Sequence, residues 1–217
     1  MNPSCFADSI RMNKNTSKHF SICGGYKIKM KKIIRVNGNE YKIIKLLGRG
    51  KGGYSYLACS HEKLVVLKKI HHEPCDFYTF GNKIESEKYA YRRLKEMGIR
   101  IPAMLAVDDN SEIIIKEYID GPTIFELVRD RIPIEPFMIQ IREMAELAKK
   151  AGINLDYFSP NFVVHDNLIY YVDYECNEYM DEWSFETWGI KYWSRTPEFE
   201  EYLKTLPKKR HLFSLWK

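Results

Sequence analysis

The sequence predicts an α+β fold with two lobes, and three observations support this prediction. Segments with strand character, separated by turns, fill the first part of the chain and enclose one helical pattern. In the second part, helical patterns surround a single short hairpin. The 217 residues include 15 Tyr, 11 Phe and 4 Trp, which supply enough apolar area for a substantial core. An antiparallel sheet with one helix, followed by a reduced and mainly helical lobe, is the arrangement that this order favours.

Basic side chains are concentrated at the beginning of the chain. The formal net charge is +5, but residues 1–36 alone hold eight Lys or Arg and a single acid, Asp8. We therefore predict a basic, flexible tail over residues 1–30 and one domain over residues 31–217. Apart from contacts of this tail, nucleic acid is not an expected partner, because the rest of the chain is slightly acidic.

The remaining composition places further limits on the class of protein. No apolar run approaches the length that would span a membrane. The five cysteines are odd in number and form no C-x-x-C pair, so we expect neither a disulfide framework nor a zinc site. This cysteine pattern fits a reducing compartment, and we predict a cytoplasmic location.

The first lobe is expected to span residues 31–118. Asn37-Gly38 lies between two apolar runs, which is a strong hairpin signal. Strand patterns follow at residues 54–58, 64–70 and 112–119. The one helix expected in this lobe covers residues 83–97 and ends at Gly98, a favoured residue just past a helix end.

The second lobe is expected to span residues 119–217. A helix should begin near Pro136 and end near Ala151, with Gly152 behind it. A hairpin should follow, with strands over residues 162–164 and 168–172. The end of the chain is expected to be helical, with its Trp and Tyr side chains buried.

A glycine motif marks the first candidate site. Gly48, Gly50 and Gly53 form G-x-G-x-x-G, a pattern that dinucleotide-binding folds also carry when a helix follows. Here a strand pattern follows, so we favour a hairpin whose backbone amides approach phosphate oxygens. A merely flexible hairpin is the alternative reading of this motif alone.

A lysine and a glutamate are expected to pair behind this hairpin. Alternation on the strand places Lys68 on one face and Lys69 on the other, and the pattern alone does not say which face is buried. Glu87 falls in the middle of the apolar stripe of the first helix. A carboxylate in that position costs several kcal/mol unless it is paired, and Lys68 is the natural partner.

Three polar residues in the second lobe form another constellation. Asp156 and Asn161 have the spacing D-x-x-x-x-N, and Asp173 follows across the expected hairpin. Folding that hairpin brings Asn161 and Asp173 to the same open end, where their oxygen atoms suit Mg²⁺. Asp156 could accept a proton from a substrate hydroxyl or orient that hydroxyl. Each acid taken alone is more often a loop or turn residue.

Taken together in this order, these motifs resemble those of the protein-kinase-like superfamily. The resemblance is closest to short bacterial serine/threonine-kinase-like proteins akin to RIO kinases and to sugar or antibiotic phosphotransferases. It extends from about residue 43 to residue 193, and Asp173-Tyr174-Glu175 stands where protein kinases have D-F-G. The segments that carry it are Leu47 to Gly53, Val65 to Lys68, Glu87, Glu117 to Ile119, Asp156 to Asn161, and Asp173 to Glu175.

The resemblance implies an ATP- and Mg²⁺-dependent kinase. Lys68, held by Glu87, and Asp156 would be catalytic, and Asn161 and Asp173 would hold the metal. The glycines and Lys68 would bind the phosphates, while backbone groups of Glu117 and Ile119 would contact adenine. The acceptor would be a protein serine or threonine, or a hydroxyl of the chain itself.

Several positions depart from the family pattern. Asn154 replaces the histidine of H-R-D, and Phe158 replaces the lysine that follows the catalytic aspartate by two residues. Ser55 stands where a valine usually covers adenine, and Lys116 occupies the gatekeeper position. No A-P-E motif follows Asp173. Two alternatives therefore remain, a pseudokinase that binds nucleotide without turnover and a kinase that acts on a small molecule.

Overall fold

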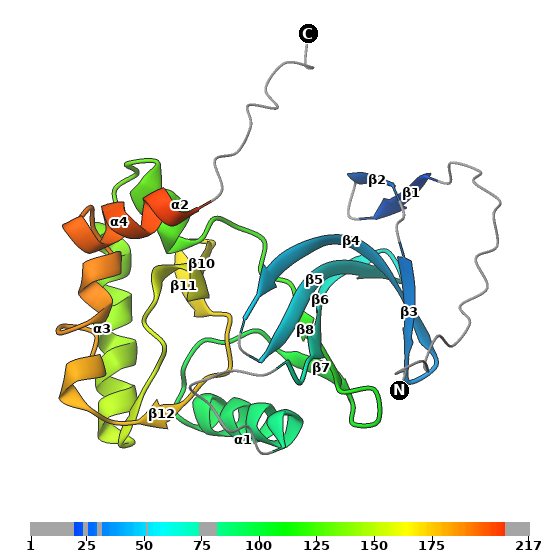
Figure 1. Ribbon diagram of the computed structural model, residues 1–217, viewed down its shortest axis with the longest axis horizontal. Coiled ribbons are helices and arrows are strands. Elements are labelled where there is room, and N and C mark those ends of the chain that lie inside the picture. The colour runs from blue at the N-terminus through cyan, green and yellow to red at the C-terminus, as the bar shows by residue number, and fades with distance from the viewer. Residues whose placement is uncertain (1–19, 24–25, 30–31, 51, 74–81, 207–217) are drawn as a thin grey trace, which may run out of the picture.

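The chain folds into a curled antiparallel sheet beside a group of helices (Figure 1). This computed structural model describes residues 20–23, 26–29, 32–50, 52–73 and 82–206. The predicted two-lobed α+β class is confirmed. Among the helices in these ranges, none is long and apolar enough to cross a bilayer.

Part of the range predicted to be a tail holds regular structure. Strands β1 (Phe20–Cys23) and β2 (Tyr26–Lys29) pair as a small antiparallel hairpin, which the sequence analysis did not foresee. The other residues of the range 1–30 lie outside the described part of the structure.

The first lobe is built on one six-stranded sheet. Its spatial order is β3-β4-β5-β6-β8-β7, and every neighbouring pair is antiparallel. The predicted turn between β3 and β4 is present, and Asn37 and Gly38 have φ values of 49° and 79°. The strands are β3 (Lys32–Val36), β4 (Asn39–Arg49), β5 (Gly53–Ser60), β6 (Lys63–Ile70), β7 (Met104–Asp108) and β8 (Ile113–Glu117).

Helix α1 (Lys83–Glu96) is the one helix of the first lobe and lies below the sheet in Figure 1. The side chain of Asn82 caps its first turn by accepting a hydrogen bond from the amide of Glu85. Gly98 follows its last turn with φ 77°, as the sequence pattern predicted. Ile84, Ala90 and Leu94 are buried on one face of the helix.

The connection between the lobes is bound to the second lobe by its backbone. The amide of Val164 donates to the carbonyl of Pro122 at 2.9 Å. A Cβ atom on Gly121 would lie 1.8 Å from the carbonyl oxygen of Val164, so only glycine fits at this position. This close approach fixes where the chain enters the second lobe.

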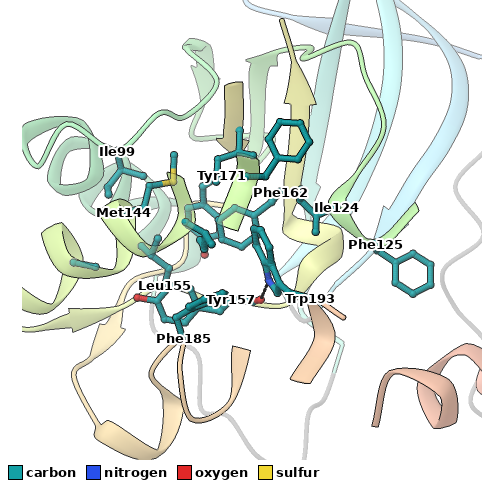
Figure 2. Packing of buried hydrophobic residues seen from close by; sticks show 14 of the residues in the cluster. Ile99, Ile124, Phe125, Met144, Leu155, Tyr157, Phe162, Tyr171, Phe185 and Trp193 are labelled. Carbon is teal, nitrogen blue, oxygen red and sulfur yellow. Dashed lines mark hydrogen bonds between the residues drawn. The ribbon is translucent and has the colours of Figure 1, made fainter. Parts of the chain in front are cut away.

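The second lobe packs its helices and short strands around a core rich in aromatic residues (Figure 2). Helix α3 contributes Phe137, Ile141, Met144 and Ala148 to this core. The Trp193 indole donates a hydrogen bond to the carbonyl of Tyr157 at 2.8 Å. The elements are α2 (Ile124–Arg129), α3 (Glu135–Lys150), β9 (Ile153–Asn154), η1 (Ser159–Asn161), β10 (Phe162–His165), β11 (Leu168–Tyr171), β12 (Asn177–Glu178), η2 (Asp181–Trp183), η3 (Gly189–Tyr192) and α4 (Pro197–Thr205).

Three features of this lobe and its neighbour differ from the expectations. Helix α2 was not predicted, although Thr123 and Glu126 form a capping box that signals a helix start. The final segment forms short 3₁₀ turns before α4, and the Trp183 side chain is 49% exposed instead of buried. Cys59 is disulfide-bonded, whereas the sequence analysis expected only that the chain lacks a disulfide framework.

Candidate active site

Lys68 forms ion pairs with one carboxylate from each lobe. Its ammonium group forms an ion pair with Oε1 of Glu87 on α1. The same nitrogen lies 3.1 Å from Oδ1 of Asp173 in the second lobe. The side chains of Lys68 and Glu87 are only 9% and 12% exposed, whereas that of Asp173 is 33% exposed.

The local structure explains why these side chains meet. On β6, Lys68 is buried and Lys69 is exposed, which resolves the alternative that the sequence left open. Glu87 lies between Ile84 and Ala90 on the buried face of α1, as the helical pattern indicated. A carboxylate at this position is stabilised by its cationic partner, because an unpaired buried charge would be strongly destabilising.

The electrostatics of the cluster follow from burial and from the neighbouring charges. Burial acts to lower the pKa of Lys68, but Asp173 and Glu87 outweigh it and raise that pKa above its usual value. Burial acts to raise the pKa of Asp173, but the positive charges of Lys68 and Lys116 lower it to about 2. Asp173 is therefore ionised at neutral pH.

The glycine motif forms a hairpin between β4 and β5 that closes over the Lys68–Glu87 pair. A Cβ atom on Gly52 would lie 3.8 Å from Oε1 of Glu87 and 3.9 Å from Nζ of Lys68. At Gly53 a Cβ atom would lie 2.5 Å from the carbonyl oxygen of Lys69, so a larger residue cannot pack there.

The other two glycines of the motif lie at the end of β4, before the turn. The amide of Gly50 donates to the carbonyl of Gly53 at 3.0 Å, and Gly48 pairs with Ser55 across the strands. A ring nitrogen of His71 lies 3.0 Å from the carbonyl oxygen of Gly50. The backbone of the hairpin is thus held close to the buried lysine.

Asp156, Asn161 and Asp173 are brought together by backbone and side-chain hydrogen bonds. The amide of Val172 donates to the carbonyl of Asn161 at 2.9 Å, so Asn161 lies across the hairpin from the residue before Asp173. The buried Tyr171 hydroxyl accepts from the amide of Asp156 at 3.2 Å and donates to the carbonyl of Glu175 at 3.0 Å. The segments that carry all three polar residues are therefore adjacent.

The side chains of this loop are oriented locally. Oδ1 of Asp156 accepts a hydrogen bond from the amide of Phe158 at 3.1 Å. The Asn161 amide nitrogen points to the carbonyl of Asp156 at 3.4 Å, which turns its amide oxygen the other way. The oxygen donors of Asn161 and Asp173 fit the preference of Mg²⁺ for hard ligands. Within the described ranges no group of three or more His, Cys, Asp or Glu side chains is suited to hold a metal ion.

The residues expected to contact a base lie at the connection between the lobes. The amide of Glu117 donates to the carbonyl of Ala103 at 2.9 Å, so a contact of Glu117 with a base would have to come from its carbonyl. Ile119 follows two residues later and is buried.

For two further residues near this site, the sequence predicted no catalytic or binding role. Phe158 packs among aromatic rings, with ring centroids 4.9 Å from Tyr192 and 4.8 Å from Tyr202. Lys116 is buried beside Lys68. Only the departure of both positions from the family pattern drew attention to them.

A sheet lobe and a helical lobe joined in this way are the arrangement of the protein-kinase-like superfamily, which the chain resembles. The chain is similar to the KEOPS complex subunit Bud32 of Pyrococcus abyssi, with 31% identity over 103 residues. The match covers 46% of this chain and 46% of that relative, so less than half of the relative's length is spanned. No family model matches the chain.

Proposed function

We propose that the protein is an ATP- and Mg²⁺-dependent phosphotransferase that phosphorylates a hydroxyl group. The observation that carries this proposal is the contact of one buried lysine with both Glu87 and Asp173. In the described part of the structure these carboxylates take two of the three donors of the ammonium group. The third donor can bind a phosphate oxygen, and the backbone amides of the glycine hairpin can bind others.

Asn161 and Asp173 would hold the metal in this proposal. Both residues offer oxygen ligands, and Asp173 is already ionised at neutral pH. Bound Mg²⁺ would neutralise the charge on the phosphates during transfer. Glu87 has a different role, because it holds Lys68 from the side of α1.

Asp156 is the proposed base for the acceptor hydroxyl. The hydroxyl oxygen forms a bond to the γ-phosphorus, and the bond from that phosphorus to the bridging oxygen of ADP breaks. The proton of the hydroxyl passes to the Asp156 carboxylate. We favour a serine or threonine of a protein, or of this chain itself, as the acceptor.

Incubation with γ-labelled ATP and Mg²⁺ tests this proposal. We expect label to be transferred by the wild-type protein and to fall about 100-fold or more in Asp156→Ala and in Asp173→Asn. Asp166→Asn is the matched control, because the Asp166 side chain is 88% exposed in the turn of the β10–β11 hairpin. Label transfer that persists in both site variants would refute the proposed site.

The packing of Phe158 favours a second candidate, a module that binds nucleotide without turnover. Its ring contacts Tyr192 and Tyr202, so the position that usually supplies a cation near the phosphates supplies an apolar side chain. Saturable binding of Mg²⁺-ATP with no label transfer to any acceptor would support this candidate over the enzyme. Transfer that requires an added metabolite would instead indicate a small-molecule kinase.

A further inference from the structure

Lys116 on β8 is a buried lysine that contacts the segment carrying Asp173. The residue is 4% exposed, and its ammonium group donates to the carbonyl of Val172 at 2.6 Å. The same group lies 4.1 Å from the centre of the Tyr174 ring, within the range of a cation–π interaction. Lys116 therefore holds the residues on both sides of Asp173.

Packing alone does not explain a lysine at this position. Burial, together with the positive charge of Lys68, lowers the pKa of Lys116 to about 8. A methionine would fill a similar volume without removing a charge from water, so the lysine destabilises the fold relative to an apolar residue. A cost of this kind is expected where a side chain serves a site.

Tyr174 is fixed on two further sides. Its hydroxyl donates to the carbonyl of Pro102 at 2.6 Å in a buried position. Its ring centroid lies 5.1 Å from that of Tyr91 on α1. The Tyr174 amide in turn donates to Oδ1 of Asp173 at 2.9 Å. The orientation of the Asp173 carboxylate is thus linked to Lys116 through residues on either side of it.

We propose that Lys116 is a positioning residue that holds the Val172–Tyr174 backbone so that Asp173 faces Lys68 and the metal position. This inference rests on the proposed function, because the position of Asp173 matters most if it binds a metal with the nucleotide. The contact to Val172 spans 56 residues of sequence and joins the two lobes. It fixes the second lobe's metal ligand to the sheet that carries Lys68.

The charge of Lys116 has the opposite effect on metal binding from its hydrogen bond. A cation near Asp173 repels a divalent ion, so removal of the charge alone would strengthen metal binding. Loss of the hydrogen bond to Val172 would weaken metal binding by releasing the ligand from its position. We propose that the positioning effect is larger than the repulsion, so Lys116→Met should bind Mg²⁺ more weakly than the wild type.

Hydrogen exchange of the ligand-free protein tests the positioning directly. In Lys116→Met, the amides of residues 172–176 should exchange about 10-fold faster than in the wild type, while the core amides of the second lobe exchange no faster. Lys69→Met is the matched control, because Lys69 is an exposed lysine on the neighbouring strand β6. Unchanged exchange of residues 172–176 in Lys116→Met would overturn the proposal.

The Mg²⁺ dependence of ATP binding gives the second readout. The Mg²⁺ concentration for half-maximal binding should rise about 10-fold in Lys116→Met. Loss of a group that orients a metal ligand typically weakens metal binding by about this factor or more. Tyr174→Phe keeps every charge and loses only the hydrogen bond to Pro102, so its midpoint should move in the same direction. A midpoint that falls or stays unchanged in Lys116→Met would contradict positioning.

The two readouts separate failure of this inference from failure of the proposed function. A wild-type protein that binds no ATP with Mg²⁺ would refute the proposed function, and the exchange experiment would still decide the role of Lys116. A wild-type protein that binds Mg²⁺-ATP, with variants that show no loss of exchange protection, would refute only the inference.

Discussion

Lys68→Met should lower phosphoryl transfer from ATP by about 100-fold or more, as expected when a preorganised donor to the reacting group is removed. Methionine keeps the length of the side chain but removes the contacts to Glu87 and Asp173. The two carboxylates then remain without their shared cation, and the phosphates lose a ligand. Initial rates at saturating ATP and Mg²⁺, together with the Kd for ATP, measure the effect.

Lys69→Met serves as the control for loss of a lysine from the same strand, since Lys69 is exposed. It should retain the wild-type rate and the wild-type Kd. A Lys68→Met variant that is folded and retains activity within a few-fold of wild type would show that Lys68 does not serve the reaction.

The pH dependence of stability should change most strongly in Lys116→Met. The pKa of Lys116 is lowered from 10.5 to about 8 in the folded protein. Between these values the unfolded chain binds a proton that the folded chain does not, so the free energy of unfolding rises with pH. The rise from this group amounts to about 3 kcal/mol.

Urea unfolding of the wild type and of Lys116→Met at several pH values between 7 and 10.5 measures this contribution. Other Lys and Tyr residues titrate in the same range, so the informative quantity is the difference between the two proteins. The variant should be more stable at pH 7, and its advantage should shrink as pH rises through 8. Parallel pH profiles would show that Lys116 carries no such cost. The charged groups that set its titration are Lys68 on β6, Glu87 on α1 and Asp173.

Local sequence patterns predicted the turns and helix ends that are determined by a few neighbouring residues. The Asn37-Gly38 turn, the end of α1 at Gly98 and the β10–β11 hairpin each follow from residues that adopt one backbone conformation readily. Strand alternation placed Lys68 and Lys69 on opposite faces, but it could not say which face is covered. The covering helix, α1, decides that point.

Contacts between segments far apart in the sequence could not be predicted from these local patterns. The bond of Lys116 to Val172 and the approach of Gly121 to Val164 depend on how the two lobes meet. Strand β7 and helix α2 are short and contain little periodicity, although the capping box at Thr123 was a usable signal. The pairing of Glu87 could be predicted, because a carboxylate within an apolar stripe requires a partner.

Calorimetric titration of the wild-type protein with ATP, with Mg²⁺ and with a chelator, tests most directly whether these residues form one site for nucleotide and metal. We predict saturable binding at one site that requires Mg²⁺, is lost in Asp173→Asn and is retained in Asp166→Asn. Absence of binding by the wild type, or equal binding by Asp173→Asn, would contradict the assignment of this site.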